Sequence, residues 1–254
     1  MKFKFNIKRE LRIAAVLVTV FGLIAFTERM KDGVAVTGVH VEISNINENH
    51  FLDQDDILHL MQWKHENMKG MGIDKLNFRQ LEMRIKKDPF ISDAQIYSDL
   101  KGNVMVNVEL RRPVARIVRV DGPDGYIAED GTIMPVSEKF TARVVLITGP
   151  FIRELLKVRN VNELEEGLQL FEMVQTIRGD EFWNAQITQL DVDAKGKVTL
   201  LTQVGDETIE FGAAEDVERK FNKLKIFYKE IIPKVGWNKY DRVNLEYEGQ
   251  IVAE

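Results

Sequence analysis

The sequence predicts an α+β protein in which two globular domains follow one N-terminal apolar helix. Three observations support this prediction. Residues 13–27 carry no charge. Strand-like and helix-like hydrophobic patterns alternate through the rest of the chain. The length of 254 residues suits two domains of about 100 residues each.

The N-terminal end differs in charge from the rest of the chain. Residues 1–27 contain five basic residues and one acidic residue, a net charge of +4, and because the whole chain carries −5 the remainder carries −9. Nucleic-acid binding relies mainly on neutralising phosphates, so this acidic body argues against a nucleic-acid partner. The chain has no cysteine, which removes disulfides, thiolate nucleophiles and Cys-ligated zinc.

The uncharged segment 13–27 predicts a retained transmembrane helix. It would reach about 22 Å, short against a hydrocarbon core of about 30 Å, but the stem of Arg12 can snorkel outward. The basic flank predicts that residues 1–12 form a cytoplasmic tail and that residues 28–254 lie outside the cytoplasm. The expected lipid-facing residues are Ile13, Val16, Leu17, Val20, Phe21, Leu23, Ile24 and Phe26.

Two alternatives to an anchor remain open. A cleaved signal peptide needs small residues soon after the apolar run, and the best candidate, Gly33-Val34-Ala35, lies beyond four charged residues. A buried core helix would also be apolar on all its faces. The placement of the candidate cleavage site favours the anchor.

The hydrophobic pattern over residues 28–111 predicts the first domain, with its elements in the order strand, helix, helix, strand, strand. A strand is expected at 39–43, from its alternating pattern. Asp53 and Asn77 are predicted helix caps, and Asp56 completes a capping box with Asp53. Alternation over 94–100 and 104–110 predicts a hairpin that ends at the junction Arg111-Arg112-Pro113.

The sequence pattern over residues 112–254 predicts a mixed α+β domain with an extended antiparallel sheet. Strand patterns recur in the segments 114–120, 126–128, 132–136, 144–148, 186–192, 198–203, 208–211 and 242–247. Two amphipathic helices interrupt them, over 164–174 and 217–231, and Pro233 with Gly236 ends the second.

Several stretches resemble the FtsQ/DivIB family of extracytoplasmic division proteins, particularly the form found in Bacteroidetes-type bacteria. Those of the first part are Asp88-Pro89-Phe90-Ile91, Ala94-Gln95-Ile96-Tyr97, Leu100-Lys101-Gly102 and Arg111-Arg112-Pro113-Val114-Ala115-Arg116. Those of the second part include Tyr126-Ile127-Ala128-Glu129-Asp130-Gly131, Met134-Pro135-Val136-Ser137, Gly236-Trp237 and Val243-Asn244-Leu245-Glu246-Tyr247. The resemblance covers residues 8–254 in order.

This resemblance implies a POTRA domain at 28–111 and an FtsQ-type β domain at 112–254. It implies a single-pass inner-membrane protein of the division septum that has no enzymatic activity. Such a protein links early division components to septal peptidoglycan synthesis. The implied partners are FtsB-like and FtsL-like coiled-coil proteins, with FtsK and FtsA as further candidates, and neither a cofactor nor a small-molecule substrate is implied. The alternative is a secreted or periplasmic POTRA-containing binding module, released by signal cleavage.

No residue pattern indicates a catalytic, cofactor or metal site. The histidines at 40, 50, 59 and 65 lack metal-ligand spacing and no HExxH motif occurs. The acidic residues at 53, 55 and 56 lack the glycine and glutamate of a calcium loop, so helix capping is the better explanation.

The last predicted strand, 242–247, is the best candidate for a partner site. A terminal strand often lies at a sheet edge and offers unpaired backbone groups, although an ordinary core strand is the alternative. The resemblance implies that an FtsB-like partner adds a strand here. The expected contact residues are Asn244, Leu245, Glu246, Tyr247, Glu248, Gly249 and Gln250. Glu246 stands where relatives carry a basic residue, so a charge pair known in them is expected to be absent or reversed.

Overall fold

The computed structural model describes residues 13–23, 34–63 and 69–254, and these form two compact units. The second unit comprises Asn45–Phe51 and Leu110–Glu254, and the other described residues make up the first. The segment Asn45–Phe51 falls inside the range predicted for the first domain. It nevertheless packs with the second unit.

Residues 13–23 form a helix whose large apolar side chains are exposed. Six of the eight predicted anchor residues lie on it, whereas Ile24 and Phe26 fall outside the described residues. No helix in the described part of the chain is long and apolar enough to cross a membrane. The transmembrane span over 13–27 stays a prediction.

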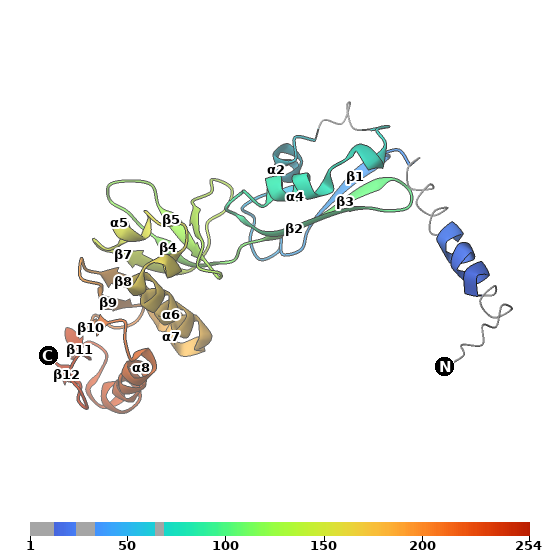
Figure 1. The fold of residues 1–254 in the computed structure, drawn as a ribbon. Helices are drawn as coiled ribbons and strands as arrows, with labels where there is room; N and C mark the ends of the chain where they lie inside the picture. Colours follow the sequence, from blue (N-terminus) through green and yellow to red (C-terminus); the bar gives the residue numbers. More distant parts are fainter. Residues whose placement is uncertain (1–12, 24–33, 64–68) are drawn as a thin grey trace, which may run out of the picture. The chain divides into compact units, whose positions relative to one another are not determined.

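The first unit has the predicted order of elements. In chain order they are β1 (Gly38–Ile43), α2 (Gln54–Leu60), the short 3-10 helix η1 (Ile73–Lys75), α4 (Phe78–Ile85), β2 (Ile91–Ser98) and β3 (Asn103–Leu110). The sheet order is β1-β3-β2, with β1 parallel to β3, and Figure 1 shows α2 and α4 on the same side of this sheet. Strand β1 pairs with β3 rather than with its sequence neighbour β2. The segment that carries the two helices connects β1 to the hairpin, and it is long enough for the parallel pairing.

Both predicted helix caps of the first unit are confirmed. The Asp53 side chain accepts from the Asp56 N–H, and the Asp56 side chain accepts from the Asp53 N–H, which is a complete capping box. The Asn77 side chain accepts from the Gln80 N–H at the start of α4. These side chains satisfy N–H groups that the first helical turn leaves without partners.

The second unit is built on one nine-stranded sheet in the described part of the chain. Its strands are β4 (Pro113–Ile117), β5 (Gly125–Ala128), β6 (Ile133–Pro135), β7 (Val145–Thr148), β8 (Ile187–Val192), β9 (Lys197–Thr202), β10 (Thr208–Ala213), β11 (Arg242–Asn244) and β12 (Val252–Ala253). The sheet order is β12-β11-β10-β9-β8-β7-β4-β5-β6.

The prediction of an extended antiparallel sheet is wrong in part, because the sheet is mixed. The pairs β4 with β7, β7 with β8 and β10 with β11 are parallel, whereas the other five pairs are antiparallel. A parallel pair needs a long crossover connection. Helices supply the crossovers between β7 and β8 and between β10 and β11.

Helices cover this sheet and close its main core. They are α5 (Ile152–Leu155), the short η2 (Val161–Glu163), α6 (Glu165–Gly179), α7 (Glu181–Gln186), α8 (Val217–Ile226), the π-helical turn η3 (Phe227–Ile231) and α9 (Ile232–Val235). Figure 1 shows α6, α7 and α8 running along the sheet. Buried side chains of α6, α7 and α8, such as Met173, Trp183 and Leu224, join those of the strands in one core.

The second predicted helix of this unit is longer than 217–231 and not uniform. Pro233 lacks the N–H that a regular α-helix needs, and the chain passes through the π-helical turn just before it. Gly236, at φ +95°, ends the helix as predicted.

The segment Asn45–Phe51 packs with the second unit because it covers the second face of β5. Tyr126 and Phe51 are both buried, and their rings meet edge to face with centroids 5.6 Å apart. The Asn45 side chain donates to the Leu110 carbonyl and accepts from the Leu110 N–H, at 2.8 and 3.0 Å. These contacts join residues far apart in sequence, so local patterns did not reveal them.

The junction arginines are paired within the second unit. Arg111 Nε lies 2.9 Å from Asp130 Oδ2, and Arg112 Nε lies 2.5 Å from Glu48 Oε2. Pro113 then begins β4. The domain ranges 28–111 and 112–254 remain predictions.

Candidate protein-interaction site

The C-terminal edge of the large sheet does not have the predicted form. The strand predicted over 242–247 ends at Asn244, and it is not an edge strand. Strand β11 lies between β10 and β12, parallel to the first and antiparallel to the second. The edge is β12, because the chain turns after Leu245 and its last residues return to pair with β11.

The ladder between β11 and β12 shows which backbone groups face outward. Arg242 and Glu254 exchange two N–H···O bonds, of 3.2 and 3.0 Å, and Asn244 is the register partner of Val252. Hydrogen-bonded and non-hydrogen-bonded pairs alternate along an antiparallel ladder. The N–H and C=O of Ala253, and those of Ile251 if the strand were extended, therefore point away from β11 toward the free edge.

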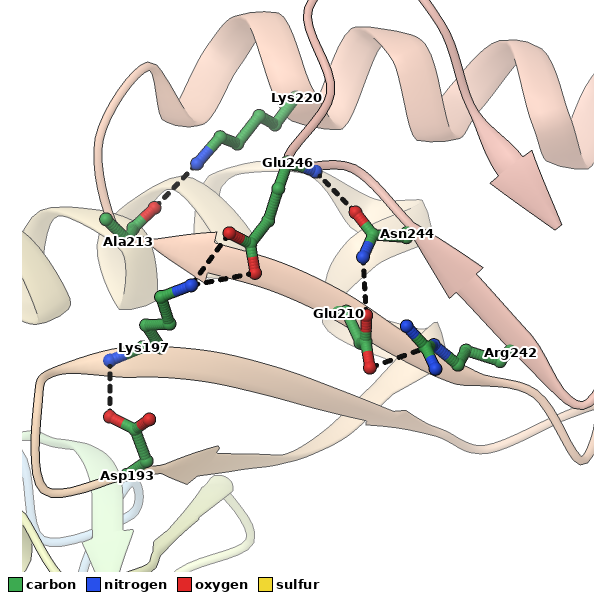
Figure 2. Close-up of polar contacts among 8 residues, drawn as sticks. All are labelled: Asp193, Lys197, Glu210, Ala213, Lys220, Arg242, Asn244 and Glu246. Carbon is green, nitrogen blue, oxygen red and sulfur yellow. Dashed lines mark hydrogen bonds and ion pairs between the residues drawn. The ribbon is translucent and has the colours of Figure 1, made fainter.

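The side chain of Asn244 serves the sheet and is not presented to a partner. It is 8% exposed, its amide donates to Glu210 Oε2, and its oxygen accepts from the Glu246 N–H at 2.8 Å. Glu210 also pairs with Arg242 at 2.9 Å (Figure 2). Leu245 is fully buried. Of the seven predicted contact residues, Asn244 and Leu245 thus belong to the interior.

Glu246 has a charge partner within the chain. Its carboxylate reaches across β10 to Lys197 on β9, with oxygens 2.8 and 3.2 Å from Nζ (Figure 2). The hydrogen bond and negative charge of Glu246 raise the pKa of Lys197. Gly212 makes this path possible, because a Cβ there would lie 2.7 Å from Glu246 Cγ. The acidic residue at 246 therefore balances Lys197, whatever its role toward a partner.

Helix α8 holds the loop that follows Leu245. Lys223 Nζ donates to the carbonyl oxygens of Leu245, Tyr247 and Gln250 at 2.9, 2.8 and 3.4 Å. Burial, and to a lesser degree the charge of Arg219, lowers the pKa of Lys223. One ammonium group thus orders the whole turn between β11 and β12.

A second lysine of α8 supports the adjacent strand. Lys220 Nζ donates to the Ala213 carbonyl at 2.7 Å (Figure 2). It also lies 4.8 Å from the centre of the Phe211 ring. Burial lowers its pKa. No structural role was predicted for Lys197, Lys220 or Lys223, since no local pattern distinguishes them from lysines on a solvated face.

The other predicted contact residues lie on the surface of this held loop. Glu246, Tyr247, Glu248, Gly249 and Gln250 are exposed, and the Tyr247 side chain is 53% exposed. The structure thus brings an exposed aromatic residue and the outward backbone of β12 to one end of the sheet. The short apolar run Ile251-Val252-Ala253 after Gly249 was the one signal that could have revealed β12.

The histidines do not gather at this site. His40 lies on β1, His59 on α2 and His50 beside Phe140, with ring centroids 5.8 Å apart, whereas His65 lies outside the described residues. No cluster of three or more metal-ligand side chains occurs in the described segments.

Comparisons with known proteins agree with this architecture. Residues 112–254 match the family model described as FtsQ/DivIB, C-terminal related, and residues 35–109 match the model described as a POTRA-like domain. The second match confirms the predicted POTRA domain type for the first unit.

Two curated relatives are both named Cell division protein FtsQ. The one from Geotalea daltonii is 24% identical over 73% of this chain and 66% of its own length. The one from Syntrophotalea carbinolica is 22% identical over 81% of this chain and 71% of its own length. The matches thus span about two thirds of these relatives. Since the first family model covers more than half of the chain, the protein belongs to the FtsQ/DivIB family.

Proposed function

We propose that this protein is a non-enzymatic, membrane-anchored scaffold of the cell-division machinery. It links early to late division proteins and helps control septal peptidoglycan synthesis by receiving a partner strand at β12. The observation that carries this proposal is the free edge of β12, whose outward backbone lies next to an exposed, held loop. Membership of the FtsQ/DivIB family supports it.

Strand addition fits the chemistry of this edge. An incoming strand gains affinity from main-chain hydrogen bonds and specificity from side chains beside the edge. Ala253 supplies outward N–H and C=O groups, and Tyr247 supplies a large exposed ring. An FtsB-like strand is the expected ligand, with FtsL-like, FtsK and FtsA proteins as further partners of the assembled complex.

The anchor is the second part of the proposal. In the helix at 13–23, Val16 is 62% exposed, Phe21 69% and Leu23 62%. A helix that is apolar on all faces is typical of a lipid environment. We therefore propose a location in the inner membrane at the division septum, with residues 1–12 cytoplasmic and the two domains periplasmic.

The N-terminus of the mature chain tests the anchor. We expect N-terminal sequencing of the protein from the membrane fraction to begin at residue 1 or 2. A mature chain that begins near Val36 would refute retention and favour a released periplasmic binding module.

Two variants of the full chain in detergent micelles test the partner site. Ala253→Pro removes an outward N–H donor, so it should weaken binding of an FtsB-like partner while leaving the melting temperature unchanged. Val252→Pro removes a donor that faces β11, so it should also disrupt the β11–β12 pair. Asn244 is unsuitable for such a proline, because its strand lies within the sheet.

Side-chain contact is tested with Tyr247→Ala. A lost hot-spot contact of roughly 2 kcal/mol would weaken partner binding about thirtyfold. Tyr97→Ala, which removes a 47% exposed tyrosine of the first unit, is the matched control and should bind normally. Unchanged partner affinity in folded Tyr247→Ala and Ala253→Pro would mean that the partner docks elsewhere. Co-purification with a tagged full chain from dividing cells identifies the partners.

A further inference from the structure

A pocket of about 510 Å³ lies within the second unit, away from the β12 edge. It is lined by the start of β4 and by the segment without secondary structure that precedes β7. The polar residues that matter for its chemistry are Glu48, Asn49, Arg112, Arg143, Arg178 and Asn184. A volume of this size suits a small ligand.

The lining of the pocket is positively charged although the protein is acidic. Three arginines and one glutamate line it, in a chain of net charge −5. Glu48 pairs with Arg112 at 2.5 Å, and Arg178 lies 3.6 Å from Glu129. Arg143 makes no ion pair or hydrogen bond with any other residue that the structure describes, so its guanidinium is available to an anionic ligand.

Asn49 is the second, independent sign of a ligand. Its side chain is 1% exposed, and neither its Nδ2 nor its Oδ1 has a hydrogen-bond partner in the described protein. A buried amide without partners costs free energy, and such groups are rare in folded proteins. Asn45, four residues earlier, bonds twice to the Leu110 backbone. A ligand that offers both a hydrogen-bond acceptor and a donor would pair with Nδ2 and Oδ1 of Asn49.

We propose that this pocket binds the free carboxylate end of a short peptide. The planar fork of an arginine matches a carboxylate with two parallel N–H···O bonds, which favours Arg143 as the carboxylate-binding residue. The amide of Asn49 can donate to the carbonyl and accept from the N–H of the last peptide group. A phosphate group presents mainly acceptors and would leave Asn49 Oδ1 unmet. This proposal does not depend on strand addition at β12.

Ligand-observed saturation-transfer NMR of the full chain in detergent micelles tests the proposal. The probes are N-acetyl dipeptides ending in Ala, Leu, Phe or Glu, each as the free acid and as the C-terminal amide. At least one free acid should bind saturably, and its amide should bind at least tenfold more weakly, because the charged acceptor is lost. Inorganic phosphate should not compete at the same concentration.

Three variants locate the binding. Arg143→Gln should weaken binding of the free acid about tenfold or more. Arg153 is an exposed arginine outside the pocket that pairs with Asp121, so Arg153→Gln should leave this affinity unchanged. Asn49→Ala should abolish binding of the free acid without lowering the melting temperature, because no group of the described protein bonds the side-chain amide of Asn49. A lower melting temperature with unchanged binding would assign Asn49 a structural role and overturn the proposal.

Three further outcomes would overturn it. In the first, no free acid binds saturably. In the second, a free acid and its amide bind equally well. In the third, Arg143→Gln and the unchanged chain have the same affinity for the free acid.

Discussion

Replacing Lys223 with methionine should loosen the C-terminal loop and the edge strand that follows it. Methionine keeps most of the length and apolar volume of the lysine stem but removes the ammonium group. Three carbonyl oxygens, those of Leu245, Tyr247 and Gln250, then lose their common donor. The loop leads directly into β12, so its order governs the edge at which we place the partner.

The size of the effect follows from the environment of each bond. The bond to Gln250 is 3.4 Å long and contributes little. The Tyr247 carbonyl is exposed, so water replaces the lysine there. The bond to Leu245 is partly buried, and a hydrogen bond to a charged group contributes about 1.5–3 kcal/mol.

Relief of the buried charge offsets part of this loss. Burial lowers the pKa of Lys223, which means that the folded protein disfavours its charged form. We therefore expect a net loss of about 1–2 kcal/mol in the free energy of local opening, or about 5- to 30-fold faster exchange of the protected amides.

Amide hydrogen exchange read by mass spectrometry measures this opening. Peptides from residues 245–254 should lose protection in Lys223→Met, while peptides from β8 and β9 keep it. Lys229→Met, which removes an exposed lysine from the next helical segment, should leave both sets unchanged. Unchanged protection of residues 245–254 in Lys223→Met would refute the assigned role of this lysine.

Three other predictions concern stability. Gly212→Ala forces φ +77° on an L-residue and sets a Cβ against Glu246, so it should cost about 1–2 kcal/mol in the free energy of unfolding, whereas Gly179→Ala, which meets no atom, should not destabilise the protein. Phe51→Ala should lower the stability of the second unit by about 3–5 kcal/mol in denaturant unfolding, because it empties the buried space over β5. The pKa of Asp180 lies below 3.8 because of hydrogen bonds from Lys225 and from the backbone, so its stabilising contribution is present above pH 4 and is lost as the pH falls through the lowered pKa; Asp180→Asn should flatten this acid dependence of stability.

Each of these predictions has a clear opposing result. Equal stability of the two glycine variants would show that φ at Gly212 carries no strain for alanine. A Phe51→Ala change below 1 kcal/mol would mean that Asn45–Phe51 is not part of the second core. If the loss of stability at acid pH were the same in Asp180→Asn, this carboxylate would not contribute to it.

Local interactions made much of the first unit predictable. The capping box of Asp53 and Asp56, the Asn77 cap and the hairpin involve residues near one another in the chain, so the sequence pattern indicates them directly. The end of the last helix at Gly236 followed in the same way from its conformational freedom.

The candidate site was predicted only in outline. The pattern at 242–247 located the right end of the chain, but it extended the strand past Asn244 and placed it at the edge. Alternation shows which residues share a face of a strand, yet it does not show which strand lies next to it. The return of Val252 to Asn244 decided that, and two residues are too few to give a periodic signal.

By itself the sequence determined most of the longer helices and strands, the two-domain order, the acidic body behind a basic N-terminus, and the family resemblance that the comparisons confirmed. Tertiary structure alone decided the mixed strand order, the ion pair between Glu246 and Lys197, the loop held by Lys223, and the unmet amide of Asn49 beside Arg143. The physical reason is how far apart in the chain the interacting residues lie. Caps, turns and periodicities depend on neighbours within a few residues, whereas the pairing of charges, the choice of an edge and the shape of a pocket depend on segments that only folding brings together.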